Sequence, residues 1–147
     1  MMRVVLVTAA MLLALPVAAQ EDAVGRVKTL TAPAWVVTGS ERAEAAVGMP
    51  VRQNDVVETG AGGALGLSFK DNTMISLGPN SRLSIDEFVF APTEEKYSFV
   101  TKIARGTMYF VSGAIARLAP EKVQVSTPVG TIGIRGTRFL VKADDEG

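Results

Sequence analysis

Apolar and polar residues alternate in short segments along most of this chain, and this pattern restricts the folds open to it. Alternation at every second residue is typical of strands that turn one face to a core, and it recurs from Leu65 to Val141. Turn-forming residues at 60–63, 70–72, 78–81 and 127–130 separate the segments. Strands between such turns indicate an all-β fold, a compact β-sandwich or a short β-helix of stacked short strands. We expect its inner face to contain Leu67, Phe69, Ile75, Leu77, Leu83, Ile85, Phe110, Val125 and Phe139.

One pattern occurs twice near the C-terminus, at residues 103–111 and 133–141. Arg, Gly, Thr, an aromatic residue and Val stand at identical offsets in the two copies. Glycine relaxes the backbone, whereas Thr, aromatic residues and Val suit a half-buried strand. Each copy therefore predicts a turn residue followed by a strand, and the repetition predicts similar strands that wrap against each other.

Three segments depart from the alternation. Residues 41–47 have high helix propensity but are too few for a stable helix, so we favour a polar hairpin loop there. Residues 92–96 form a charged loop between strands, and the acidic tail at 142–147 is expected to fray.

The N-terminus resembles a secretory signal peptide at residues 1–19. Arg3 precedes an apolar run at 4–15, Pro16 ends the run, and small residues precede Gln20. The run is shorter than the roughly 20 residues that span a bilayer, although an uncleaved anchor is the alternative interpretation. We expect one domain at residues 20–147, without a transmembrane segment once the signal is cleaved, in the periplasm or alternatively outside the cell.

Composition excludes several classes of function. The chain has no cysteine, so it forms no disulfides and has no lipidated Cys. Loss of the leader removes Arg3 and leaves one more acidic than basic residue, which does not favour nucleic acid as a partner.

Catalytic residues are not indicated. The absence of His and Cys removes the commonest general base, the thiol nucleophile and most transition-metal ligands. A Ser–Lys dyad is compatible with the composition, but no spacing singles out a pair among Ser76, Ser126, Lys102 and Lys122. We therefore expect no enzyme and no cofactor.

Two further motifs have structural explanations. Glycines at 130, 133 and 136 lack the spacing and following helix of a phosphate loop, and we expect them to let strands or turns approach closely. Asp55, Asp71 and Asp86 lack a known calcium-loop spacing, so no metal site is expected.

Three side chains are speculative ligand contacts. Arg105 and Arg135 occupy equivalent positions in the repeat and could bind a carboxylate or a sugar on a partner. We favour a structural role, in which each arginine ties its turn to backbone carbonyls or to an acidic side chain. Trp35, the one tryptophan, is expected in the core more than at a contact.

Four segments in succession resemble the FecR domain family. VRQNDVVETG at 51–60 resembles its opening motif, and LGLSFKDNTMISLGPNS at 65–81 resembles its hairpin. GTMYFV at 106–111 resembles its "GxxxFxV" strand, and VSTPVG at 125–130, with Val141 at the far end, resembles its closing motif. The likeness extends over about residues 48–142, and its structural motif residues are Asp55, Thr59, Gly60, Asp71, Pro79, Asn80, Ser81, Gly106, Thr127, Pro128, Gly130, Arg135, Gly136, Thr137 and Phe139.

The resemblance implies a periplasmic sensory domain. Family sensors join it through a transmembrane helix to a cytoplasmic anti-sigma segment and receive a signal from an outer-membrane transporter. We expect no anti-sigma region before this domain, and therefore no regulation of a sigma factor. Asn54 and Asn72 stand where the family usually has glycine, and we expect positive φ at both.

We therefore expect a stand-alone, non-catalytic FecR-type module for protein binding, signalling or scaffolding, whose unidentified partner is an envelope protein. Exposed strand edges would bind that partner by strand addition. The alternative is a structural or carbohydrate-binding envelope protein that contacts peptidoglycan through Trp35, Tyr97 and Tyr109.

Overall fold

The computed structural model describes residues 22–134 and 136–144. The predicted leader at 1–19, Arg135 and the end of the acidic tail lie outside these residues. No helix in the described part of the chain is long and apolar enough to cross a membrane. The elements are β1 (Gly25–Thr31), β2 (Ala34–Thr38), β3 (Glu41–Glu44), β4 (Pro50–Val51), β5 (Val56–Thr59), β6 (Ala64–Phe69), β7 (Met74–Leu77), β8 (Arg82–Ala91), η1 (Pro92–Glu94), β9 (Lys96–Val111), α1 (Ala114–Leu118), η2 (Pro120–Lys122), β10 (Val123–Thr127), β11 (Gly130–Gly133) and β12 (Arg138–Ala143).

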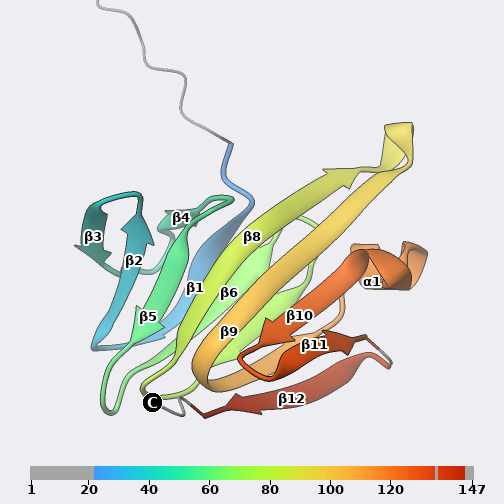
Figure 1. Ribbon diagram of the computed structural model, residues 1–147. Coiled ribbons are helices and arrows are strands. Elements are labelled where there is room, and N and C mark those ends of the chain that lie inside the picture. Colours follow the sequence, from blue (N-terminus) through green and yellow to red (C-terminus); the bar gives the residue numbers. More distant parts are fainter. Residues whose placement is uncertain (1–21, 135, 145–147) are drawn as a thin grey trace, which may run out of the picture.

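These strands form one curled sheet, as Figure 1 shows. The main path runs β3-β2-β5-β8-β9-β7-β6-β1-β4; β10 and β12 also pair with β9, and β11 pairs with β10. All pairs are antiparallel except β9 with β10. The all-β prediction is confirmed, and the antiparallel pairing makes the fold a half-barrel and not a β-helix, whose strands pair in parallel.

The long strand β9 belongs to both halves of the curled sheet. Its N-terminal part pairs with β8 and β10, and its C-terminal part pairs with β7 and β12. We call the first set, with β2, β3, β5 and β11, the β8 half, and the second set, with β1, β4 and β6, the β6 half. The two halves meet where β9 passes Gly106, whose φ is +93°.

A single hydrophobic core lies between the halves. Phe69 of the β6 half packs edge-on against Phe99 of the β8 half, with ring centroids 4.9 Å apart. Every residue predicted for the inner face is buried except Phe139, which is half-buried and stacks on Phe110 at 4.7 Å. The period-two pattern therefore identified the core face of the sheet.

The repeat differs from its prediction in one respect. Its second copy leads from Gly136 into β12, but its first copy lies wholly within β9, so Gly106 bends a continuous strand and makes no turn. The two copies pair with each other, since residues 138–142 lie antiparallel to residues 107–111. The predicted contact between similar strands is confirmed.

One local prediction needs correction. Residues 41–44 form strand β3, which pairs with β2, because the hairpin places their backbone against an existing strand. All four residues are exposed, so their polar character is satisfied by solvent. The charged loop predicted at 92–96 contains a short 3-10 turn at Pro92–Glu94, between β8 and β9.

Candidate functional site

Where β9 passes from one half of the sheet to the other, near Gly106, hydroxyl groups from two distant motifs form hydrogen bonds that hold the strands together. The Thr59 hydroxyl donates to the Gly78 carbonyl at 2.6 Å and accepts the Ser81 backbone N–H at 2.9 Å. The Ser81 Oγ in turn accepts the Thr107 N–H at 3.0 Å. A Cβ on Gly106 would lie 2.5 Å from the Cα of Ser81, so only glycine fits there. The motif residues thus join β5, β8 and β9 at the corner of the sheet.

Neighbouring residues of the same motifs extend this corner. The Gly60 N–H donates to the Pro33 carbonyl, and the Gly60 carbonyl accepts the Asn80 N–H. Asn80, which follows Pro79, has a φ of +53°. A Cβ on Gly60 would crowd both Pro33 and the Trp35 ring. The turn at 60–63 is therefore held against the start of β2.

Asp71 connects the β6–β7 hairpin to α1 and is almost fully buried. Its carboxylate accepts the backbone N–H and the hydroxyl of Thr73, at 3.0 and 2.8 Å, and the Ile115 N–H at 3.1 Å. Its backbone carbonyl accepts the Ala114 N–H. A Cβ on Gly113 would collide with Thr73 and the Asp71 carbonyl, so the helix approaches closely because that residue is glycine.

Asp55 has a similar role at the β4–β5 turn. Its carboxylate accepts the Thr38 hydroxyl and the Arg52 N–H, both at 2.8 Å, and is buried. Asn54 and Asn72 have φ values of 72° and 67°, which confirms the positive φ predicted for both. The described residues contain no group of carboxylates that could hold a metal ion.

The closing motif forms the β10–β11 hairpin. The Thr127 hydroxyl donates to the Gly130 carbonyl and accepts the Val129 N–H. Pro128 lies in this turn, and beside it Val129 is 95% exposed. Further on, the Thr137 and Gly136 carbonyls accept the Ser112 N–H and hydroxyl, which fixes the approach to β12.

The prediction that Gly130, Gly133 and Gly136 let strands or turns approach closely is wrong. A Cβ on Gly130, Gly133 or Gly136 would meet nothing within 4 Å, so close packing does not require them. Gly130 and Gly136 instead have φ values of +157° and +89°. Backbone conformation explains these two, because L side chains are strained at positive φ.

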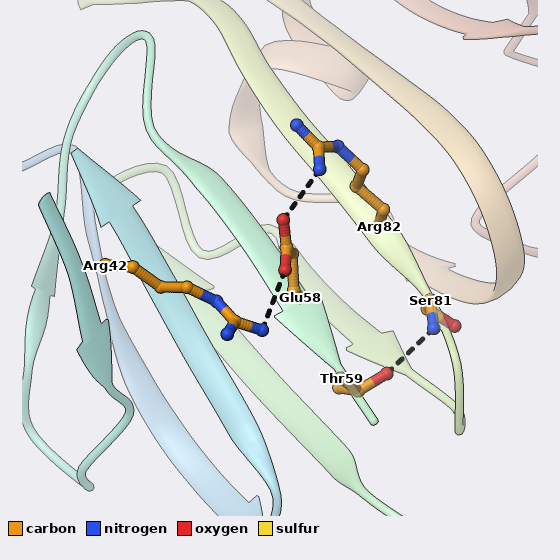
Figure 2. A network of polar contacts seen from close by, with 5 residues as sticks. All are labelled: Arg42, Glu58, Thr59, Ser81 and Arg82. Carbon is orange, nitrogen blue, oxygen red and sulfur yellow. Dashed lines mark hydrogen bonds and ion pairs between the residues drawn. The ribbon is translucent and has the colours of Figure 1, made fainter. Parts of the chain in front are cut away.

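A row of charged side chains crosses the outer face of the β8 half. Strand register aligns Trp35, Glu58, Arg82 and Arg105 on β2, β5, β8 and β9. Figure 2 shows the Glu58 carboxylate between two guanidinium groups, that of Arg82 at 2.7 Å and that of Arg42 at 3.3 Å. The sequence did not reveal this network, because its members are 16 and 24 residues apart.

Trp35 is not a core residue. Ala34 and Val36 occupy the inner face of β2, so alternation turns Trp35 outward, where it is half-buried. The Arg42 guanidinium lies 3.9 Å from its ring centroid, an arrangement that cation–π attraction favours. One face of the ring is therefore occupied by the protein itself.

Of the paired arginines, Arg135 lies outside the described residues. Arg105 lies opposite Arg82, and its side chain forms no ion pair or hydrogen bond with the described part of the chain. The structural tie expected for this arginine is not found there. Arg105 is half-buried at the end of the charged row.

One Ser–Lys pair comes together across β9 and β10, where Lys102 lies opposite Ser126. The Ser126 hydroxyl is 3.3 Å from that of Thr131, and Lys102 is exposed. Lysines that activate a nucleophile are usually desolvated, so this pair lacks the surroundings of a catalytic dyad. Ser76 and Lys122 lie on other elements, β7 and η2.

The geometry described so far serves mainly to hold a fold. No curated protein and no solved structure matches the chain. The FecR protein family matches residues 55–147, which include the Thr59–Ser81 corner, Asp71 and the closing hairpin. Because this match covers more than half of the sequence, the chain belongs to the FecR protein family.

Proposed function

We propose that this chain is a non-catalytic FecR-type module of the periplasm, which binds an envelope protein by strand addition at the free edge of β11. Its role would be signalling or scaffolding. The observation that supports the proposal is that β11 is the unguarded edge of the described sheet. Family membership is compatible with the proposal, and the signal-like residues 1–19 support the location.

Four strands lie at edges of the described sheet, and three of them have features that discourage pairing with another chain. β3 contains Glu41, Arg42 and Glu44; β4 has two residues, one of them Pro50; β12 contains Arg138 and Lys142. Charges, proline and short length are the usual protections of an edge strand.

β11 is short, with four residues, but it lacks the charges and the proline that protect the other three edges. Its sequence, GTIG, contains no charge and no proline, and all four residues are exposed. It pairs with β10 alone, so the backbone groups of its other side face away from the sheet. An extended segment of a partner would gain main-chain hydrogen bonds there, and the side chains of Ile132 and Val129 offer apolar contacts.

The test is capture of partners from a periplasmic extract after gentle crosslinking, with the purified chain as bait. We expect a protein partner that Ile132→Lys no longer captures, because a charge on an edge strand opposes pairing. Ala43→Lys is the matched control on the guarded edge β3 and should capture the same partner. Recovery of no protein by the unaltered chain, or equal recovery by both variants, would contradict the proposal.

The alternative, a structural or peptidoglycan-binding protein, is favoured by Tyr109, whose side chain is 39% exposed on the outer face of β9. Sugars stack on open aromatic faces, but Arg42 already covers one face of Trp35. Co-sedimentation with purified cell wall separates the two functions. Pelleting that is lost in Trp35→Ala or Tyr109→Ala would favour the alternative; no pelleting is expected from the protein-binding module.

A further inference from the structure

The two halves of the sheet differ in charge, although the whole chain is formally neutral. Strands β1, β4, β6, β7 and β12 of the β6 half contain four basic residues, Arg26, Lys28, Arg138 and Lys142, and no acidic residue. Strands β3, β5 and β8 of the other half contain five acidic residues and two basic residues, Arg42 and Arg82. The outer face of the β6 half is thus cationic.

A cavity of about 490 Å³ opens on this face, where β1 and the end of β6 lie beside the loop between β3 and β4. Its volume lies within the range of about 300–1,000 Å³ that small-molecule sites occupy. Arg26, Lys28 and Lys70 line it, and no carboxylate does. Asp22 lines an adjacent, smaller hollow that shares Lys70.

The three cations of this cavity are not neutralised by the described residues. None of the ion pairs in that part of the chain includes them. The Arg26 guanidinium donates to the Gly48 carbonyl at 3.0 Å, which braces the loop that forms one wall. Three positive charges around one hollow attract an anion, since none of the described residues that line it is acidic.

The cavity also has an apolar side. Val47, which lines it, is 67% exposed on the wall loop. Met74 lies opposite Ser68, another lining residue, and is also exposed, so apolar surface continues onto β7. Exposed apolar groups beside unpaired cations fit a ligand that has both an apolar body and an anionic group.

We propose that this cavity binds a small amphipathic anion, an apolar chain or ring that ends in one carboxylate or phosphate. Arg26, Lys28 and Lys70 would hold the anionic group, and Val47 and Met74 would contact the apolar body. This site lies on β1 and β6, away from the β11 edge, so it does not depend on the proposed protein-binding function.

The experiment is isothermal titration of the purified chain with decanoate and with decyl phosphate, both below their micelle-forming concentrations. We expect saturable binding at one site per chain. The ligand that binds more tightly, decanoate or decyl phosphate, shows whether the site prefers a carboxylate or a phosphate. Decanol and decyltrimethylammonium should not bind. Lys28→Glu, Lys70→Glu and Val47→Asp should each weaken binding by about tenfold or more, because each removes a charge-assisted or apolar contact.

Lys102→Glu is the matched control, a charge reversal at an exposed position on the β8 half. It should leave the affinity unchanged. The altered side chains are all exposed, so circular dichroism and thermal melting should show the same fold in every variant. Equal binding of the cationic or neutral amphiphile, or unchanged affinity in the three cavity variants, would overturn the proposal.

Two further binding measurements test whether the site binds a free phosphate or a membrane surface in place of a small amphipathic anion. Inorganic phosphate that binds as tightly as decyl phosphate would remove the apolar body from the proposal and overturn it. Adsorption to phosphatidylglycerol vesicles, without binding of the monomeric anions, would also overturn it in favour of a membrane surface. Binding of the monomeric anions with the expected variant effects supports it.

Discussion

The corner at Gly106 permits a quantitative test, because the repeat provides its own control. Gly106 and Gly136 occupy the same position in the two copies and have nearly the same φ, +93° and +89°. Their surroundings differ completely: a Cβ would collide with Ser81 at the first position and would meet nothing within 4 Å at the second. Replacement of each by alanine therefore separates backbone strain from crowding.

Gly136→Ala should cost only the strain of an L-residue at positive φ, about 1–2 kcal/mol. Gly106→Ala has the same strain and must also displace Ser81, whose Cα and Cβ would lie 2.5 and 2.6 Å from the new methyl group. Moving Ser81 weakens its hydrogen bonds with Thr59 and Thr107, each worth about 1 kcal/mol. We expect a total loss of about 3–5 kcal/mol for Gly106→Ala.

Urea unfolding followed by circular dichroism measures both losses on one scale. The expected result is a lower midpoint for both variants and a difference of about 2–3 kcal/mol between them. Equal losses would refute the claim that the corner is held by close contact between Gly106 and Ser81. A loss below about 1 kcal/mol at Gly106 would also refute the strain assigned to its backbone. Gly136→Val, with a bulkier side chain, should lose about 1–3 kcal/mol.

Three further predictions use the same unfolding assay. Thr101→Val should stabilise the chain by about 1 kcal/mol, because the buried Thr101 hydroxyl has no hydrogen-bond partner among the described residues; destabilisation would contradict this. Asp71→Ala should destabilise by about 3 kcal/mol, since it leaves the buried N–H groups of Thr73 and Ile115 unpaired; a loss below about 1 kcal/mol would contradict this. Asn72→Gly should stabilise by up to about 1 kcal/mol by removing strain at a φ of 67°, and no gain would mean that the Asn side chain compensates.

Much of the fold could be predicted because its signals are local. Alternation at period two depends on the pleat of a single strand, so Leu67, Phe69 and Ile75 could be assigned to the core without knowing their partners. Positive φ at Asn54 and Asn72 could be predicted because the FecR family usually has glycine at both positions. The family motifs added the prediction that these turns and strands form one domain.

Other features could not be predicted because they depend on register between distant strands. Glu58 meets Arg42 and Arg82 only after β3, β5 and β8 are aligned with β2. Trp35 was wrongly expected in the core, because its type suggests burial but its place on β2 turns it outward.

The sequence by itself determined an all-β chain, with its inner face and its special turns, because steric limits on φ and the two-residue pleat act within a few residues. Its motifs, by their resemblance, also indicated the FecR family. The tertiary structure alone decided that β9 joins both halves, that β11 is the unguarded edge, and that Arg26, Lys28 and Lys70 surround one cavity. These arrangements depend on which strands pair across long separations. Packing of the whole core selects that pairing, and no short segment specifies it.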